Sequence, residues 1–83
     1  MMYYMYILQS DQTGKFYIGS TGNLEDRLLR HNSGRSKATR NGVPWQLVWS
    51  ETFFTRSEAM CREMEIKSWK SHQRIAELVS ASR

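Results

Sequence analysis

The chain has little of several residue types and segments, and each shortage excludes a class of protein. One cysteine, Cys61, occurs among its 83 residues, so no disulfide can form within the chain and a reducing cytosol is the expected location. No apolar run approaches the ~18 residues that a membrane-spanning helix needs. The apolar N-terminus alternates with tyrosine and lacks a basic segment, which indicates a strand instead of a signal peptide. Repeats, low-complexity segments and linkers are missing as well, so the sequence predicts a single domain over residues 1–83.

Acidic residues are outnumbered by basic ones. The chain holds 12 lysines and arginines against 8 aspartates and glutamates, which gives a net charge of +4 and a pI near 9.6. A basic surface favours polyanionic partners such as DNA, although many small basic proteins bind none. A chain of this length buries about 60% of its extended surface on folding, so its core is small. Stability can therefore depend on a partner protein or on a second copy in a homodimer.

Turn and capping residues divide the first half of the chain into three predicted elements. Strand-forming residues predict strands over 2–9 and 16–19, joined by a turn in which Gly14 is available for a positive φ. Asn23 then has the position of an N-cap for a short helix over 24–31. This half of the chain is expected to form a hairpin followed by a helix.

The second half continues with a strand and more helix. Residues 32–45 form a polar, basic connection, and strand-forming residues follow over 46–52. Thr55 and Glu58 have the spacing of a capping box before a helix over about 57–70, and a last amphipathic turn or two follows. The order β-β-α-β-α-α predicts an α+β fold, with a small three-stranded, mainly antiparallel sheet flanked by helices.

Two short strings near the N-terminus place tyrosines in adjacent predicted strands. They are Tyr4-Met5-Tyr6 and Tyr17-Ile18-Gly19. Strand alternation puts Tyr4 and Tyr6 on one face and Met5 on the other. Aromatic residues are ordinary strand material, so either string alone indicates core packing more often than chemistry.

Glu63 has an unusual position on the long predicted helix. Ala59, Glu63 and Ile66 fall at i, i+4 and i+7, so the carboxylate shares a stripe with apolar neighbours. One interpretation is a glutamate at the edge of the stripe, paired with Lys67 at i+4. The other is a ligand for one Mg²⁺ or Mn²⁺ ion, which keeps several waters and takes one or two carboxylates. The chain offers no dense acidic cluster that would bridge two metals.

Basic residues suggest contacts with phosphate. Arg27 and His31 lie at i and i+4 on the first predicted helix and therefore point the same way, where arginine offers a bidentate fork. Each remaining basic residue, taken alone, is best explained as solvated surface. As a group they indicate contacts with the nucleic-acid backbone, and they are Arg30, Arg35, Lys37, Arg40, Lys67, Lys70 and Arg74. The three tryptophans are expected in the core or at its rim.

Several motifs follow one another along the chain in an order that is typical of a known family. They are Tyr4-Met5-Tyr6, Tyr17-Ile18-Gly19-Ser20-Thr21, Arg27 with His31, Lys37-Ala38-Thr39-Arg40, Pro44, and Ala59 to Trp69 around Arg62-Glu63 and Lys67. With these motifs the chain resembles the small stand-alone bacterial GIY-YIG domain proteins. The resemblance covers roughly residues 3–75. The same module resembles the nuclease parts of some homing endonucleases, the excision-repair incision protein and a branched-DNA nuclease. The first string departs from the family pattern, because it reads Tyr-Met-Tyr instead of Gly-Ile-Tyr while keeping Tyr6.

The resemblance implies roles for individual residues. Tyr6 and Tyr17 would flank the attacking water, with Tyr17 or His31 assisting its deprotonation, and Arg27 would bind the scissile phosphate. Glu63 would hold one Mg²⁺ or Mn²⁺ ion, and Thr39 would join the basic residues in contacting nucleic acid. A phenolate at neutral pH needs a pKa shift of roughly 3 units from about 10, so Tyr17 is either the base or a residue that positions the water.

The resemblance also implies an activity. It predicts a divalent-metal-dependent endonuclease that hydrolyses DNA phosphodiester bonds, structure-directed or non-specific, with a role in DNA repair or recombination. The chain has no room for a separate recognition domain, so we expect weak, salt-sensitive binding, with RNA as an alternative substrate. The alternative function is a non-catalytic nucleic-acid-binding or protein-interaction module that keeps the fold. All five residues Tyr6, Tyr17, Arg27, His31 and Glu63 are present, which favours the enzyme.

Overall fold

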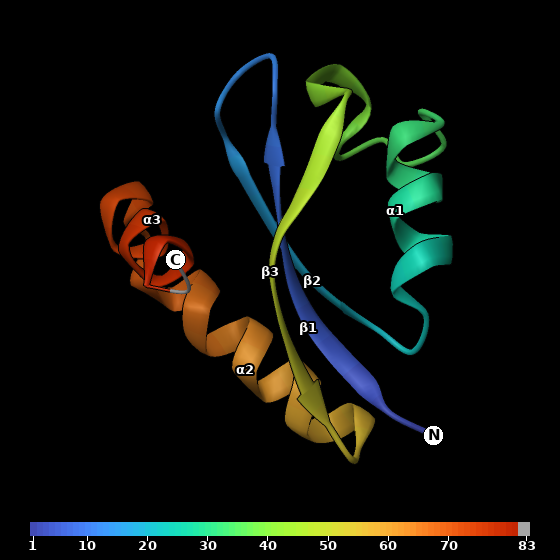
Figure 1. Ribbon diagram of the computed structural model, residues 1–83, viewed down its shortest axis with the longest axis vertical. Helices are drawn as coiled ribbons and strands as arrows, with labels where there is room; N and C mark the ends of the chain where they lie inside the picture. The colour runs from blue at the N-terminus through green and yellow to red at the C-terminus, as the bar shows by residue number, and fades with distance from the viewer. Residues whose placement is uncertain (82–83) are drawn as a thin grey trace.

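The computed structural model describes residues 1–81, so the last two residues of the expected domain lie outside its description (Figure 1). The elements are β1 (Tyr3–Ser10), β2 (Phe16–Thr21), α1 (Leu24–Asn32), a short 3₁₀ helix η1 (Arg40–Gly42), β3 (Trp45–Phe53), α2 (Arg56–Trp69) and α3 (His72–Ser80). The predicted α+β fold class is confirmed. The expected final turn or two is a helix of 9 residues.

The sheet has the order β2-β1-β3, with β1 in the centre and antiparallel to both neighbours. Tyr6 in β1 lies opposite Gly19 in β2 and Ser50 in β3. A bulge between Ile7 and Leu8 shifts the pairing with β3. Because β2 is an edge strand, its outer side pairs with no further strand of the described residues.

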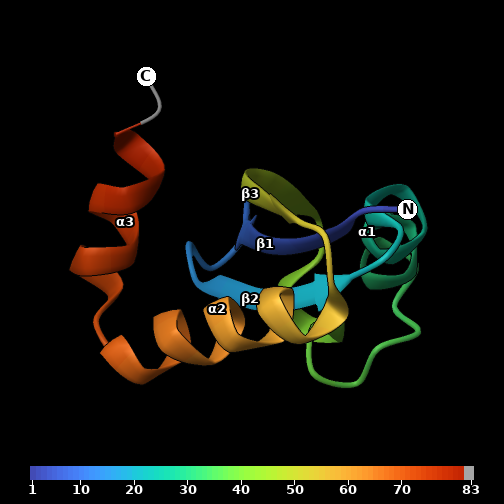
Figure 2. The same cartoon turned by 90° about the horizontal axis from the view of Figure 1, so that it is seen from below.

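Local hydrogen bonds begin the helices where the sequence predicts. The Asn23 side chain accepts from the Asp26 backbone N–H at 3.0 Å, and Thr55 and Glu58 form the predicted capping box. Lys70 takes a left-handed conformation with φ of 50° after α2. The chain therefore turns sharply there, and α3 stands across the end of α2 (Figure 2).

Helices cover both faces of the sheet. Figure 1 shows α1 on one side and α2 with α3 on the other. On the α2 side, Met5 and Ile7 pack with Ile66 in a fully buried cluster. On the α1 side, Tyr6 and Leu8 form a second buried cluster, which also contains Trp45. The face on which the tyrosines were expected is thus largely core, because α1 closes over it.

Among the helices that residues 1–81 form, none has both the length and the apolar character needed to cross a membrane.

Candidate active site

The Tyr6 ring lies across Gly19, its partner in the neighbouring strand. A Cβ atom built on Gly19 would lie 2.5 Å from the Tyr6 hydroxyl oxygen and 2.6 Å from the ring carbon that carries it. Any larger residue at position 19 would therefore displace the ring. The glycine of the Tyr17-Ile18-Gly19 string is explained by this close approach to the first string.

The Tyr6 hydroxyl meets His31 from α1. Its oxygen lies 3.0 Å from His31 Nε2, and the other ring nitrogen, Nδ1, lies 2.8 Å from Thr39 Oγ1. Tyr6, His31 and Thr39 are 2%, 3% and 1% exposed. Because both nitrogens of the imidazole are occupied, its position and orientation are held from both sides.

Trp45 and Asn32 support this buried chain of contacts. Trp45 donates its indole N–H to the Thr39 carbonyl at 2.7 Å. The Asn32 side chain bonds both main-chain groups of Trp45, accepting from its N–H at 2.6 Å and donating to its carbonyl at 3.0 Å. The loop between α1 and β3 is therefore tied to the helix that carries His31.

The surroundings keep both Tyr6 and His31 neutral at pH 7. Burial, followed by the charges of Arg27 and Arg30, lowers the pKa of His31 below its usual 6.5. Burial, with a contribution from Tyr17, raises the pKa of Tyr6 to about 12. Glu63 also raises the Tyr6 pKa, whereas the Arg27 guanidinium lowers it. The Tyr6 hydroxyl therefore lies within electrostatic reach of the other expected site residues.

Tyr17 is less buried than Tyr6. Its ring centroid lies 4.8 Å from that of His31 and 6.3 Å from that of Trp45, in an edge contact with the latter. The side chain is half-buried. Within residues 1–81 its hydroxyl forms no hydrogen bond, so it is the phenol of this pair that can meet a ligand.

Arg27 brings an unsatisfied donor to the same place. Its Nε atom is buried and has no hydrogen-bond partner in the part of the chain that the structure describes. Leaving a buried donor unpaired costs about 1–3 kcal/mol, so an orphan of this kind calls for an explanation. A phosphate toward which the guanidinium turned would supply the missing partner.

Glu63 approaches from α2, on the other side of β2. Its Oε1 accepts from Ser20 Oγ at 2.7 Å, and its Oε2 lies 2.6 Å from Lys67 Nζ. The Glu63 side chain is 18% exposed and the Lys67 side chain 50%. The structure shows the first of the two interpretations of Glu63, because the carboxylate shares a stripe with buried Ala59 and Ile66 and pairs with Lys67. The second interpretation, a metal ligand, stays a prediction.

The donor set fits a single hard cation with few protein ligands. No group of three histidine, cysteine, aspartate or glutamate side chains able to hold a metal occurs in residues 1–81. Mg²⁺ and Mn²⁺ are satisfied by one or two carboxylates, with water and substrate phosphate completing their coordination. Ser20 orients the Glu63 carboxylate, and the Lys67 ammonium balances its charge. The carboxylate therefore suits one such ion.

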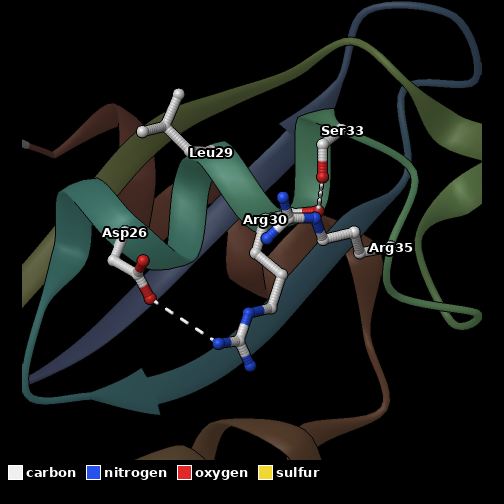
Figure 3. A pocket seen from close by; sticks show the side chains of 5 residues that line it. All are labelled: Asp26, Leu29, Arg30, Ser33 and Arg35. Atoms are coloured by element: carbon white, nitrogen blue, oxygen red, sulfur yellow. Dashed lines mark hydrogen bonds and ion pairs between the residues drawn. The ribbon is translucent and has the colours of Figure 1, made fainter.

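Two of the expected nucleic-acid-binding residues share a pocket on the outer side of α1. It encloses about 320 Å³ and is lined by Asp26, Leu29, Arg30, Ser33 and Arg35 (Figure 3). Arg30 pairs with Asp26 at 3.8 Å, and Ser33 donates its hydroxyl to the Arg30 carbonyl at 2.9 Å. In Figure 3 the Leu29 side chain points away from the two arginines. The pocket is thus basic on one side only.

The other expected nucleic-acid-binding residues are scattered. Lys37, Arg40 and Lys70 are exposed, and Arg40 donates from Nε to the Gly34 carbonyl at 3.3 Å. Thr39 differs from the expectation, because it is buried and bonded to His31, which leaves no surface for nucleic acid. Its threonine hydroxyl holds the imidazole instead.

Three supporting residues were not predicted from the sequence. They are Ser20, Asn32 and Trp45, which hold the Glu63 carboxylate and the loop beside His31. Ser20 directly follows the Tyr17-Ile18-Gly19 string, and that position alone indicates no role for it. The contacts of Asn32 and Trp45 carried no sequence signal, because they join residues 13 positions apart.

Comparisons with known proteins show the family to which the chain belongs. A family model described as "GIY-YIG catalytic domain" matches residues 2–76. The chain is 40% identical over 79 residues to the UPF0213 protein SSP2268 of Staphylococcus saprophyticus, covering 94% of each chain. It is 44% identical over 79 residues to a UPF0213 protein of Haloquadratum walsbyi, covering 90% of this chain and 86% of the relative.

A solved structure is also similar. The solution NMR structure of the UPF0213 protein BH0048 from Bacillus halodurans matches with a TM-score of 0.61 and 36% identity, covering 98% of this chain and 85% of that one. Family model, relatives and structure all span nearly the whole chain. The chain therefore belongs to the GIY-YIG family of nuclease domains.

Proposed function

We propose that this protein is a divalent-metal-dependent endonuclease that hydrolyses DNA phosphodiester bonds, directed by DNA structure or without sequence preference. The observation that carries the proposal is the buried, unpaired Nε of Arg27, whose guanidinium charge acts on both Tyr6 and His31. An arginine fork binds a phosphate through two parallel hydrogen bonds, and it stabilises the charge that develops during hydrolysis. Membership of a nuclease family supports the same chemistry.

The two tyrosines have different roles in this proposal. Tyr6 is buried and its pKa is raised to about 12, so it stays a neutral phenol that positions His31. His31 is itself buried with both nitrogens occupied, and it does not meet the attacking water. Tyr17 is half-buried with an unbonded hydroxyl, and it contacts the water as its base or its positioning group.

Glu63, oriented by Ser20, is the ligand that would hold one Mg²⁺ or Mn²⁺ ion. Nucleases of this family generally use a divalent metal. Such an ion, when bound, neutralises charge on the phosphate and on the leaving oxygen. Lys67 neutralises the charge of the Glu63 carboxylate when no metal ion is bound. Because the Lys67 side chain is half-exposed, its ammonium can move into solvent when an ion takes its place.

Substrate binding is expected to rest on the phosphate backbone. Arg30, Arg35, Lys37 and Lys70 are exposed cations that can contact phosphates without reading bases. Affinity should therefore fall steeply as salt is raised.

The test is cleavage of labelled linear, nicked and branched DNA, with matching RNA, in the presence of Mg²⁺ or Mn²⁺. Wild type is compared with Glu63→Gln and with Glu77→Gln, an exposed glutamate of α3 that serves as the matched control. We expect wild type and Glu77→Gln to cleave DNA and Glu63→Gln to fail. Equal cleavage by Glu63→Gln and wild type would refute the assignment of Glu63 as the metal ligand. Retained binding without cleavage of any substrate would favour the non-catalytic module.

A further inference from the structure

A second cavity lies directly beside Tyr17. It encloses about 310 Å³, and its lining includes Thr13, Lys15, Tyr17, Ala38, Asn41 and Trp45. These residues come from the turn between β1 and β2, from β2 itself, from the loop that carries η1, and from the first residue of β3. Its volume is at the small end of the range of about 300–1,000 Å³ for ligand pockets, so it suits one small ring system.

The wall formed by Trp45 is rigid. The indole N–H is bonded to the Thr39 carbonyl, and the ring packs against Gly42 so closely that no Cβ fits there. Tyr17 meets Trp45 edge-on, with ring centroids 6.3 Å apart. The cavity therefore has an aromatic lining whose position is set before any ligand arrives.

Two polar side chains of the cavity, Asn41 and Lys15, are uncommitted, whereas the Thr13 hydroxyl accepts from the Lys15 backbone N–H at 3.2 Å. Within residues 1–81 the Asn41 side-chain amide forms no hydrogen bond, and Lys15 has no acidic partner. An amide can donate and accept at the same time, as the edge of a nucleobase requires. An ammonium group beside it suits the adjoining phosphate.

We propose that this cavity binds the unpaired base of a nucleotide next to the scissile phosphate. The inference rests on the proposed function, because Tyr17 belongs both to the cavity and to the candidate active site. Single-stranded nucleic acid is held in this way, by aromatic side chains for the base and cations for the backbone. A paired base is stacked in its duplex and must be flipped out to enter, at an energetic cost. The protein thus prefers single-stranded, nicked or branched DNA at the cleavage point.

Binding measured without divalent ions separates this inference from catalysis. Fluorescence anisotropy compares a labelled single strand, its duplex, and an abasic strand of equal length that keeps the phosphates and lacks the bases. Ala38→Leu fills the cavity from an exposed position, and Ala81→Leu adds the same volume at the exposed end of α3 as a control. Asn41→Ala removes the amide.

We expect wild type and Ala81→Leu to bind the single strand about tenfold more tightly than the duplex or the abasic strand, as one stacked base allows. Ala38→Leu should lose this preference and Asn41→Ala should weaken it, while neither changes binding of the abasic strand. Equal binding of all three probes by wild type, no binding at all, or an unchanged preference in Ala38→Leu would overturn the inference. None of those results bears on whether the wild type cleaves DNA. A preference for the base-containing single strand without cleavage would refute the proposed nuclease activity and leave the role of the cavity standing.

Discussion

Replacing Tyr6 with phenylalanine tests the central buried contact of the site. At neutral pH the change removes the hydroxyl that lies 3.0 Å from His31 Nε2 and leaves that nitrogen unpaired in a side chain that is 3% exposed. An unpaired buried group of this kind costs about 1–3 kcal/mol. We therefore expect Tyr6→Phe to lower the free energy of unfolding at pH 7 by this amount.

The same variant should change how stability depends on alkaline pH. The Tyr6 pKa is raised from 10.0 to about 12, so its contribution to stability is complete below pH 10 and is lost as pH rises through 12. Two pKa units correspond to about 3 kcal/mol, which the wild type loses over this window and Tyr6→Phe does not.

Tyrosine absorbance at alkaline pH and urea unfolding measure these effects. Wild type should show one late titration step, which Tyr6→Phe removes. Tyr4→Phe is the matched control, because Tyr4 lies on the same strand and its hydroxyl forms no hydrogen bond within the described chain. A late step that persists in Tyr6→Phe, or an equal loss of stability in both variants, would refute the reasoning.

Three further predictions concern the same site. Gly19→Ala should cost about 1–3 kcal/mol in urea unfolding, because its Cβ would lie 2.5 Å from the buried Tyr6 hydroxyl, and an unchanged midpoint would contradict this. The contribution of His31 to the free energy of unfolding should be complete above about pH 6.5 and should decline as pH falls through the lowered pKa of His31. A His31→Gln variant whose free energy of unfolding falls as steeply with acid as that of wild type would exclude His31 as the cause. Lys67→Met should tighten Mn²⁺ binding about fivefold in calorimetry, since an ammonium 2.6 Å from Glu63 competes with the ion, and unchanged affinity would argue against Glu63 as the ligand.

The helices and strands could be predicted because their signals are local. Asn23 caps α1 by a bond to a residue three positions on, and Thr55 and Glu58 cap α2 in the same way. Gly14 takes the positive φ of 75° that its turn needs. The length of α3 was underestimated, because the sequence predicted a last turn or two where the structure has a helix of 9 residues capped by Ser71.

The identities of the candidate site residues also came from the sequence, through their order and the family they resemble. How deeply each of these residues is buried did not follow from the sequence. Tyr6 and Tyr17 have the same chemistry and similar strings, yet one is buried and the other half-exposed. Gly19 makes room for the Tyr6 ring from the neighbouring strand and α1 covers that ring, so the difference depends on contacts across the sheet and between elements.

By itself, then, the sequence determined the order of elements, the caps and the set of residues that could carry phosphodiester chemistry. The tertiary structure alone decided that Thr39 holds His31 and that Ser20, 43 positions from Glu63 along the chain, orients its carboxylate. The physical reason is range. Caps and turns depend on hydrogen bonds between residues a few positions apart, whereas the site forms only when α1 and α2 pack on opposite faces of the sheet beside the open edge of β2.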